Sequence, residues 1–292
     1  MIYTIQNKQL RVQISDFGAE LMSIQTADGC EYLWQGNPEF WASRASNLFP
    51  ICGRLTGGKY TCDGQTYEMN LHGFARHMAM TAEPQGEDRI AFHLSDSEQT
   101  RAQYPFHFAL TISYELEGAT LRETFTVHNP SDKTVLPFAV GGHPGFNVPL
   151  EAGEHFEDYY VEFDTVEPVQ RVVMSDACLD TGRRVPFALE DGTRLPLRHT
   201  LFDNDAIFLT EMSSGITLKS HKCNRTVHLS YPQMNALGLW HKPHTEAPYV
   251  CIEPWYSLPA YDGEVDDIHT KHLMVHLQPN RTYTNTFAIT IG

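Results

Sequence analysis

Three short segments, far apart in the chain, each carry one proton-handling side chain among small and aromatic residues. They are His72 in LHGFAR, His143 in GGHPGFN and Glu253 in CIEPW. Two imidazoles and a carboxylate that fold together can donate and accept protons near neutral pH. Glycines let a ligand approach the backbone, and aromatic rings can pack on the faces of a sugar. The combination predicts acid–base chemistry on a small polar ring compound, without a covalent nucleophile.

Each histidine also has a purely structural interpretation. His143 lies between Gly141-Gly142 and Pro144-Gly145, which we expect to form a rigid turn that presents the imidazole to a cleft at a strand end. The alternative is a turn histidine that only caps the backbone. For His72, which precedes Gly73-Phe74-Ala75-Arg76, the local pattern taken alone favours a solvated loop histidine.

Glu253 stands near the end of an apolar strand that is followed by Pro254, Trp255 and Tyr256. We expect its carboxyl group to be partly buried, and burial raises the pKa of a carboxyl by disfavouring the charged form. A raised pKa brings a weak base toward the range useful for proton abstraction at neutral pH. The alternative is a glutamate that forms a structural ion pair, with Arg54 as the partner.

Two further polar residues are candidates for ligand binding. Arg54 follows Gly53, and a guanidinium fork can grip adjacent sugar hydroxyls or a carboxylate. Asp205 precedes a predicted strand and could accept hydrogen bonds from two hydroxyls. An Asx-turn that opens the strand is an equally good local interpretation of Asp205.

Other kinds of site have little support. The sequence contains no G-x-S-x-G elbow, H-E-x-x-H helix, Walker loop or dinucleotide fingerprint. The two histidines and Glu253 could in principle hold zinc, but their wide separation lacks metal-ligand spacing. We therefore predict neither a metal nor a cofactor.

Composition narrows the partners and the compartment. The formal net charge of −15 disfavours nucleic acid and anionic membrane surfaces. No stretch approaches the roughly 18 apolar residues of a membrane span, and the N-terminal residues lack the pattern of a signal peptide. The six cysteines form no CxxC pair, which is typical of reduced thiols. We expect a cytoplasmic protein, either a monomer or a homodimer.

The pattern of apolar residues is that of strands throughout. Tyr60-Thr61-Cys62, Asp63-Gly64 and Gln65-Thr66-Tyr67 form a strong hairpin signal. Only residues 95–103 resemble a helix, and residues 151–200 are irregular enough to suggest an extended insertion. Further strands are expected at 2–6, 9–14, 19–26, 107–116, 120–128, 134–140, 206–210, 216–219, 226–231, 248–253, 272–277 and 283–291. Many antiparallel strands with closely spaced turns predict an all-β sandwich or barrel, and we expect residues 1–292 to form a single domain.

Taken together, these segments resemble the aldose 1-epimerase (mutarotase) family, and most closely its bacterial branch associated with lactose and galactose use. The resemblance covers nearly the whole chain. It is carried by Phe49-Pro50 with Gly53-Arg54-Leu55, the hairpin of residues 60–67, His72-Gly73-Phe74-Ala75-Arg76, Gly142-His143-Pro144-Gly145-Phe146, Gly238-Leu239-Trp240 and Ile252-Glu253-Pro254-Trp255. Each of these motifs is common by itself, whereas the ordered set is specific.

The resemblance implies a large antiparallel β-supersandwich of the galactose mutarotase type and interconversion of the α and β anomers of an aldose. Glu253 matches the general base that removes the anomeric hydroxyl proton, and His143 the general acid that protonates the ring oxygen. His72 and Arg54 match substrate-binding positions. Asp205 matches the hydroxyl-binding aspartate, although Asp203 could align there instead.

Two departures from galactose mutarotase bear on the substrate. Pro144-Gly145-Phe146 follows His143 and Trp255 follows the base, and both differences fall at the expected sugar pocket. Arg76 and Lys59 raise the alternative of a hexose 6-phosphate, because an arginine beside the first histidine could clamp a phosphate. A catalytically silent sugar-binding or sugar-sensing protein, and a hydrolase or lyase on the same kind of sandwich, are the competing functions.

Overall fold

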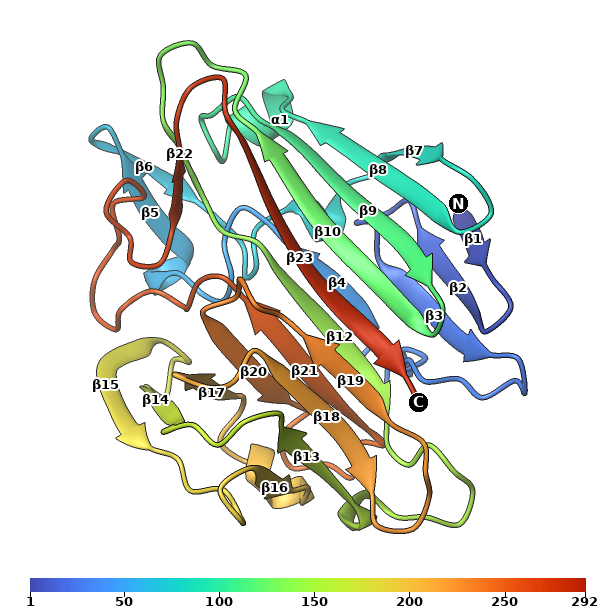
Figure 1. The fold of residues 1–292 in the computed structure, drawn as a ribbon. Coiled ribbons are helices and arrows are strands. Elements are labelled where there is room, and N and C mark those ends of the chain that lie inside the picture. Colours follow the sequence, from blue (N-terminus) through green and yellow to red (C-terminus); the bar gives the residue numbers. More distant parts are fainter.

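Two large antiparallel sheets dominate the computed structural model, which describes residues 1–292 (Figure 1). In spatial order, the nine-stranded sheet contains β16 (Arg194–Pro196), β13 (Tyr159–Phe163), β18 (Gly215–Ser220), β19 (Val227–Ser230), β23 (Thr282–Ile291), β10 (Thr120–His128), β9 (Ala109–Glu117), β8 (Arg89–Ser95) and β7 (Thr81–Pro84). The seven-stranded sheet contains β15 (Asp180–Pro186), β14 (Gln170–Met174), β17 (Ile207–Thr210), β20 (Ala236–Trp240), β21 (Tyr249–Trp255), β12 (Gly141–Asn147) and β4 (Ala45–Leu48).

Three small sheets and a few short helices complete the fold. The sheets are β1 (Ile2–Gln6), β2 (Leu10–Ser15) and β3 (Leu21–Thr26); β5 (Lys59–Cys62) and β6 (Gln65–Glu68); and β11 (Leu136–Phe138) and β22 (Val275–Leu277). The helices are α1 (Glu98–Arg101) and the 3₁₀ turns η1 (Thr56–Gly58), η2 (Ala75–His77), η3 (Phe156–Asp158) and η4 (His199–Phe202). All of these helices are short, and none has the length and apolar character needed to cross a membrane.

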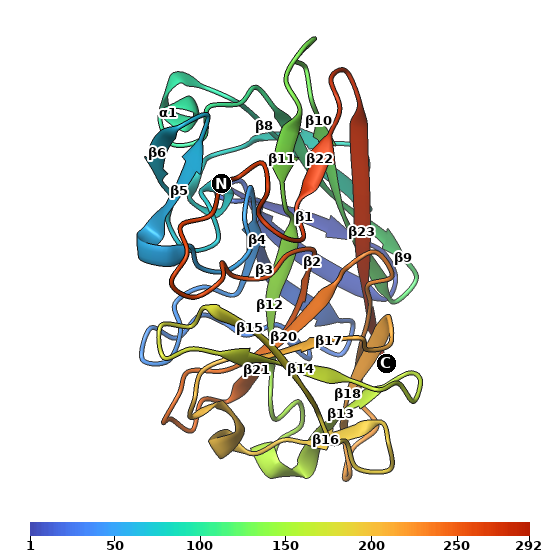
Figure 2. The ribbon, with the colours of Figure 1, turned by 90° about the vertical axis from the view of Figure 1, so that its left-hand side faces the viewer.

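The two large sheets pack face to face through alternating apolar side chains. On β10, Leu121, Phe125 and Val127 are buried while Arg122 between them is exposed, as the period-two pattern of this segment predicts. On the opposing sheet, Gly142 of β12 lies under the ring of Phe287 from β23, so closely that a Cβ atom at Gly142 would be 2.6 Å from its Cζ. Figure 2 shows β12 and β23 in different layers. The all-β supersandwich expected from the sequence is therefore confirmed.

Most predicted elements are present, with two instructive differences. The Asp63-Gly64 hairpin forms as β5 and β6, and residues 120–128 form β10 as expected. The helix expected at 95–103 shrinks to α1, which Ser97 caps. Residues 151–200 are not an irregular insertion, because they supply β13 to β16, which lie at one end of both large sheets. One continuous apolar core of 74 buried residues joins these strands to the rest, which supports our proposal that the chain is one domain.

One carboxyl group is buried in the core without being part of any cavity described below. Glu123 lies on β10 among apolar neighbours with 3% of its surface exposed, and its Oε1 has no hydrogen-bond partner within the protein. Burial raises its pKa to about 8, and the nearby hydroxyl group of Tyr114 offsets only part of this effect. The folded state therefore holds a proton that the unfolded state releases at lower pH.

We predict that Glu123 makes a contribution to the free energy of unfolding that falls as pH rises between about 4.5 and 8, because the unfolded glutamate ionises first. The slope contributed by this single proton is at most about 1.4 kcal/mol per pH unit. Glu123→Gln should remove that contribution, measured by urea denaturation across this pH range. Glu87→Gln, at an exposed site, is the control and should leave the slope unchanged. Equal slopes for the native protein and Glu123→Gln would contradict the prediction.

Candidate active site

A cavity of about 240 Å³ lies at the seven-stranded sheet, and seven of the residues singled out from the sequence line it. Those residues are Arg54, His72, Arg76, His143, Asp205, Glu253 and Trp255. The volume lies just below the range of roughly 300–1,000 Å³ that is typical of drug-sized ligand pockets. The cavity therefore suits a small ligand.

The pairing of two neighbouring strands brings His143 and Glu253 together. On β12 and β21, Gly141 lies opposite Trp255 and Gly145 lies opposite Cys251. His143 is midway between these glycines, so it lies directly across from Glu253. Directly opposed residues of antiparallel strands project to the same face with their Cβ atoms about 4.5–5.5 Å apart. In the folded chain, His143 Nε2 is 3.3 Å from Glu253 Oε2.

The next strand leaves space for the carboxyl group. Gly238 of β20 pairs with Glu253 from the other side. A Cβ atom at position 238 would lie 3.2 Å from Glu253 Oε2 and 3.2 Å from the ring of Phe208. A larger residue at this position would push the carboxyl group away from His143.

Burial sets the charge of the pair. His143 and Glu253 are 8% and 2% exposed. Burial raises the pKa of Glu253 well above its ordinary value and lowers the pKa of His143 to about 3. Each group is thus held in its uncharged form, and the two groups face each other across the Oε2–Nε2 contact. His143 Nδ1 and Glu253 Oε1 have no hydrogen-bond partner within the protein.

Aromatic rings surround the pair. The imidazole of His143 lies against Trp41, with ring centroids 4.9 Å apart, and meets the edge of Trp240 at 5.9 Å. Trp255 packs against His72 and Phe208, and its indole Nε1 has no partner within the protein. These rings give the cavity apolar walls on which the face of a sugar could pack.

His72 is held in one tautomer by the backbone. The amide of Gly53 donates to His72 Nδ1 at 3.0 Å, so this nitrogen must carry a lone pair. Burial, with the charges of Arg76 and Arg54 adding to it, keeps the pKa of His72 well below its ordinary value. The neutral ring therefore carries its proton on Nε2, which makes Nε2 a hydrogen-bond donor.

The backbone around His72 has little freedom. His72 is itself in the left-handed region, with φ of 65°. The following Gly73 (φ 74°) lies against the carbonyl oxygen of Phe49, where a Cβ atom would be only 2.3 Å away. Phe49 O also accepts hydrogen bonds from Phe74 and Ala75. The buried His72 is thus a rigidly held side chain and not the solvated loop histidine of the local interpretation.

Two arginines reach the cavity without a carboxylate partner. Neither Arg54 nor Arg76 forms an ion pair, and the Nε of Arg76 is buried without a hydrogen-bond partner. The Arg54–Glu253 ion pair considered from the sequence is therefore absent, and Glu253 contacts His143 instead. Guanidinium groups without protein partners can bind hydroxyl or anionic groups of a ligand.

The two aspartates proposed for hydroxyl binding lie in different places. Asp205 lines the cavity, where its Oδ2 accepts from the Cys178 thiol at 3.0 Å and its Oδ1 from the Ala206 amide at 2.9 Å. Asp203 does not line it and instead pairs with His244 at 3.3 Å. Geometry thus favours Asp205 as the hydroxyl-binding aspartate. Its contact with the Ala206 amide is also a local turn contact, as the alternative interpretation of an Asx-turn expected.

One expectation about local structure is wrong. The glycines and proline around His143 do not form a turn, because residues 141–147 are strand β12, hydrogen-bonded between β4 and β21. Small residues here make room for rings that cross the sheet. Gly145 lies beneath Trp41, and Gly141 lies beside Trp255.

Several lining residues were not among the candidates. They include Trp41, Met174, Cys178, Asn204, Phe208, Trp240, Pro243 and Pro259. Trp240 belongs to the Gly238-Leu239-Trp240 motif, which was a usable signal. Trp41 comes from the connection before β4 and has no local pattern that marks it.

The group of metal donors in this region differs in one member from the set considered from the sequence, with Cys251 in place of His72. The donors of His143, Glu253 and Cys251 lie within 4.8 Å of one another, whereas His72 is outside this group. Cys251 is completely buried and does not line the cavity, so an ion that enters the cavity has no open path to its thiol. We therefore assign no metal role to this group.

Comparison with known proteins gives a consistent result. The family model described as aldose 1-epimerase matches residues 1–290. The chromosomal LacX protein of Lactococcus lactis subsp. lactis is 33% identical over 100% of this chain and 99% of its own length. A galactose mutarotase related enzyme from Lactobacillus acidophilus is 36% identical, with a TM-score of 0.94 over 100% of this chain and 97% of that one. A galactose mutarotase-like protein from Lactobacillus casei is 30% identical, with a TM-score of 0.94 over all of both chains.

We predict that Gly73→Ala is markedly destabilising, because its Cβ would collide with Phe49 O. Gly153→Ala is the matched control, since Gly153 also has a positive φ (87°) but has nothing within 4 Å of the new methyl group. The control should lose about 1–2 kcal/mol from the left-handed backbone alone. Gly73→Ala should lose roughly 2 kcal/mol more from overpacking, measured by chemical denaturation. Similar losses of stability in the two variants would contradict the prediction, because they would mean that the loop before η2 moves to accommodate the methyl group.

Proposed function

This chain belongs to the aldose 1-epimerase family, and from that premise we propose that it interconverts the α and β anomers of a hexose by acid–base ring opening and closure. The observation that carries the proposal is the contact of 3.3 Å between His143 Nε2 and Glu253 Oε2 at the wall of one small cavity. An acid and a base that are this close can act on two oxygens bonded to the same carbon. The anomeric hydroxyl and the ring oxygen of an aldose are two such oxygens.

The proton transfers in this proposal start from the neutral pair of His143 and Glu253. The neutral pair and the carboxylate–imidazolium pair contain the same number of protons, so one shift from Oε2 to Nε2 prepares both catalysts. Glu253 then takes the anomeric hydroxyl proton while His143 protonates the ring oxygen. The bond between the anomeric carbon and the ring oxygen breaks, and the free aldehyde forms. Rotation about the first carbon–carbon bond and the reverse transfers close the ring in the other configuration.

The remaining lining residues supply binding in this proposal. His72 donates from Nε2 to a sugar oxygen, because its Nδ1 is already occupied by the Gly53 amide. Arg54 donates to hydroxyls and Asp205 accepts from them. Trp41, Trp240 and Trp255 pack on the apolar faces of the ring. The substrate is thus a monosaccharide held by polar groups at its edge.

We predict that Glu253→Gln and His143→Asn each slow anomer exchange by about 10²–10⁴-fold, the usual contribution of a single acid or base. The measurement is polarimetric equilibration of freshly dissolved α-glucose and α-galactose. Glu246→Gln, at an exposed site on the loop between β20 and β21, is the control and should keep the native rate. Normal rates in both cavity variants would end the proposal.

The same measurements address the competing function of a sugar-binding or sugar-sensing protein. Saturable binding of monosaccharides by the native chain without any acceleration would favour that function. Formation of a cleaved or unsaturated product would favour the hydrolase or lyase alternative.

A phosphorylated hexose is a second candidate substrate. Arg76 reaches the cavity without an ion-pair partner, and its buried Nε is unsatisfied. The two catalytic groups are uncharged, so the positive charge of Arg76 and Arg54 is opposed within the cavity only by Asp205. Lys59, which the sequence also suggested, does not line the cavity and lies 3.9 Å from Glu68 on the β5–β6 hairpin.

For this candidate substrate, we predict that Arg76→Gln slows anomer exchange of a hexose 6-phosphate by about 10–100-fold more than it slows exchange of the free hexose. This is the loss expected when one hydrogen bond to a charged group is removed. The measurement is the ratio of kcat/KM for glucose 6-phosphate and glucose in both proteins, since the free sugar controls for changes in the cavity itself. An unchanged ratio would exclude phosphate binding by Arg76.

A further inference from the structure

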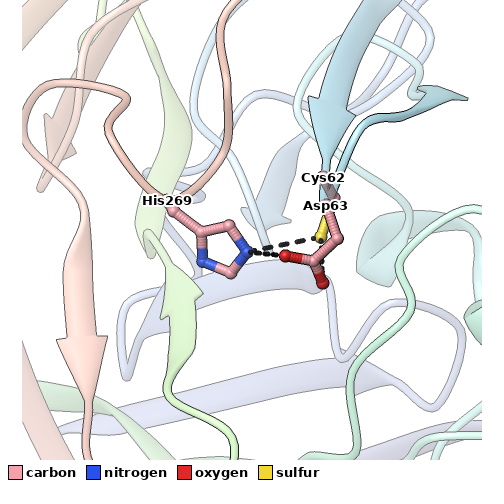
Figure 3. A group of neighbouring side chains, drawn as sticks. All are labelled: Cys62, Asp63 and His269. Carbon is pink, nitrogen blue, oxygen red and sulfur yellow. Dashed lines mark hydrogen bonds and ion pairs between the residues drawn. The ribbon is translucent and has the colours of Figure 1, made fainter.

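A second group of potential ligands lies outside the sugar cavity, where the β5–β6 hairpin meets the loop after β21. Cys62 ends β5, Asp63 begins the hairpin turn, and His269 comes from the loop. None of the three lines the cavity. Figure 3 shows the imidazole of His269 facing the thiol and the carboxylate across the gap between the two segments.

The imidazole of His269 contacts both other donors, through a hydrogen bond with the Cys62 thiol and a longer contact with the Asp63 carboxylate. His269 Nε2 is 3.4 Å from Asp63 Oδ1 and 3.5 Å from Cys62 Sγ. N–H···O hydrogen bonds span roughly 2.7–3.2 Å, so the imidazole–carboxylate contact is too long to be a good one. A tetrahedral zinc ion with ligands at about 2.3 Å (S) and 2.0–2.1 Å (N, O) separates S from N by about 3.6 Å and N from O by about 3.3 Å. The observed spacings match that geometry.

The exposure of the group fits an open metal site. Cys62 is buried, His269 is partly exposed, and the side chain of Asp63 is 87% exposed. A thiolate, an imidazole and a carboxylate are the ligand types that zinc prefers. The solvent side leaves room for a water molecule as the fourth ligand.

The two segments are held in register without help from an ion. The Thr61 amide donates to Asp266 O at 2.8 Å, and the Ile268 amide donates to Thr61 O at 2.9 Å. Asp267 Oδ1 accepts from the His269 amide at 2.9 Å. These contacts on both sides of the group fix Cys62 and His269 relative to each other, so the donors are positioned in advance.

The local charge also favours a cation. Asp63, Glu264 and Asp267 lie on the hairpin turn or the loop, and a fourth carboxylate there, that of Asp266, pairs with Lys271 Nζ at 4.0 Å. Burial and the charges of Asp63 and Asp267 raise the pKa of the Cys62 thiol to about 11. A metal ion would have to displace this proton, so its affinity should increase with pH.

We propose that Cys62 Sγ, Asp63 Oδ1 and His269 Nε2 bind a zinc ion, with water as the fourth ligand and release of the thiol proton to solvent. The ion would tie the hairpin to the loop that follows β21. The same loop carries Pro259, which lines the sugar cavity against Gly53. The site lies outside the sugar cavity, and it does not depend on the proposed catalytic function.

The test is titration of the reduced, chelator-treated, full-length protein with Co²⁺, followed by displacement with Zn²⁺. We expect one equivalent to bind, with a thiolate-to-cobalt charge-transfer band in the near ultraviolet and the visible bands of a tetrahedral ion. Cys62→Ser should abolish the charge-transfer band, and His269→Ala should weaken binding by at least 100-fold. Cys223→Ser, which alters another partly buried thiol far along the chain, is the control and should retain the band.

If the substitution of the buried Cys62 disturbs folding, Asp63→Asn still tests the proposal. Asp63 is exposed and has a positive φ of 50°, which asparagine also tolerates, so this variant should fold normally yet bind Co²⁺ at least 10-fold more weakly. Zn²⁺ should raise the unfolding temperature of the native protein more than that of this variant. The proposal would be overturned by no binding below millimolar Co²⁺, or by a band that survives Cys62→Ser. A band lost only in Cys251→Ala would instead locate the ion in the sugar cavity.

Discussion

The candidate active site depends on one cross-strand pairing in the seven-stranded sheet. Because β12 and β21 are antiparallel with Gly141 opposite Trp255, His143 and Glu253 must project from the same face as direct neighbours. A shift of this register by one residue would turn one of them to the other face. Buried residues on both strands oppose such a shift. The hydrophobic packing of the two layers is therefore what fixes the distance between the proposed acid and base.

The burial that fixes the geometry of this pair also keeps both groups uncharged. It lowers the stability of the fold, because some buried polar atoms have no hydrogen-bond partner. Buried polar atoms without partners, such as Glu253 Oε1, His143 Nδ1 and Arg76 Nε, each cost about 1–3 kcal/mol. A protein selected only for stability would satisfy or replace them. Together with Trp255 Nε1, these atoms belong to residues that line one cavity, where a bound ligand could supply the missing partners. Other unsatisfied atoms, such as Glu123 Oε1, lie away from the cavity and have no such explanation.

The sequence predicts the strands better than the site, for physical reasons. Period-two alternation identifies β10, and the Asp63-Gly64 turn identifies the β5–β6 hairpin, because both signals are local. The surroundings of His143 mislead, since glycine and proline usually mark turns. Here the glycines make room for Trp41, Trp255 and Phe287, which come from distant segments. Residues 151–200 mislead similarly, because edge strands carry fewer buried residues than central ones.

The site residues were found through motifs, and their grouping is explained only by tertiary contacts. Trp41 could not be singled out, since its place over His143 depends on how the segment before β4 crosses the sheet. His72 shows the same dependence, because its tautomer is set by the amide of Gly53, nineteen positions earlier. Gly53 in turn lies so close to Pro259 that a Cβ atom would be 2.6 Å from its Cγ. The cavity wall is thus a chain of close backbone contacts from the loop after β21, through Gly53, to His72. The position of the proposed donor His72 therefore depends, through Gly53, on where Pro259 of that loop lies.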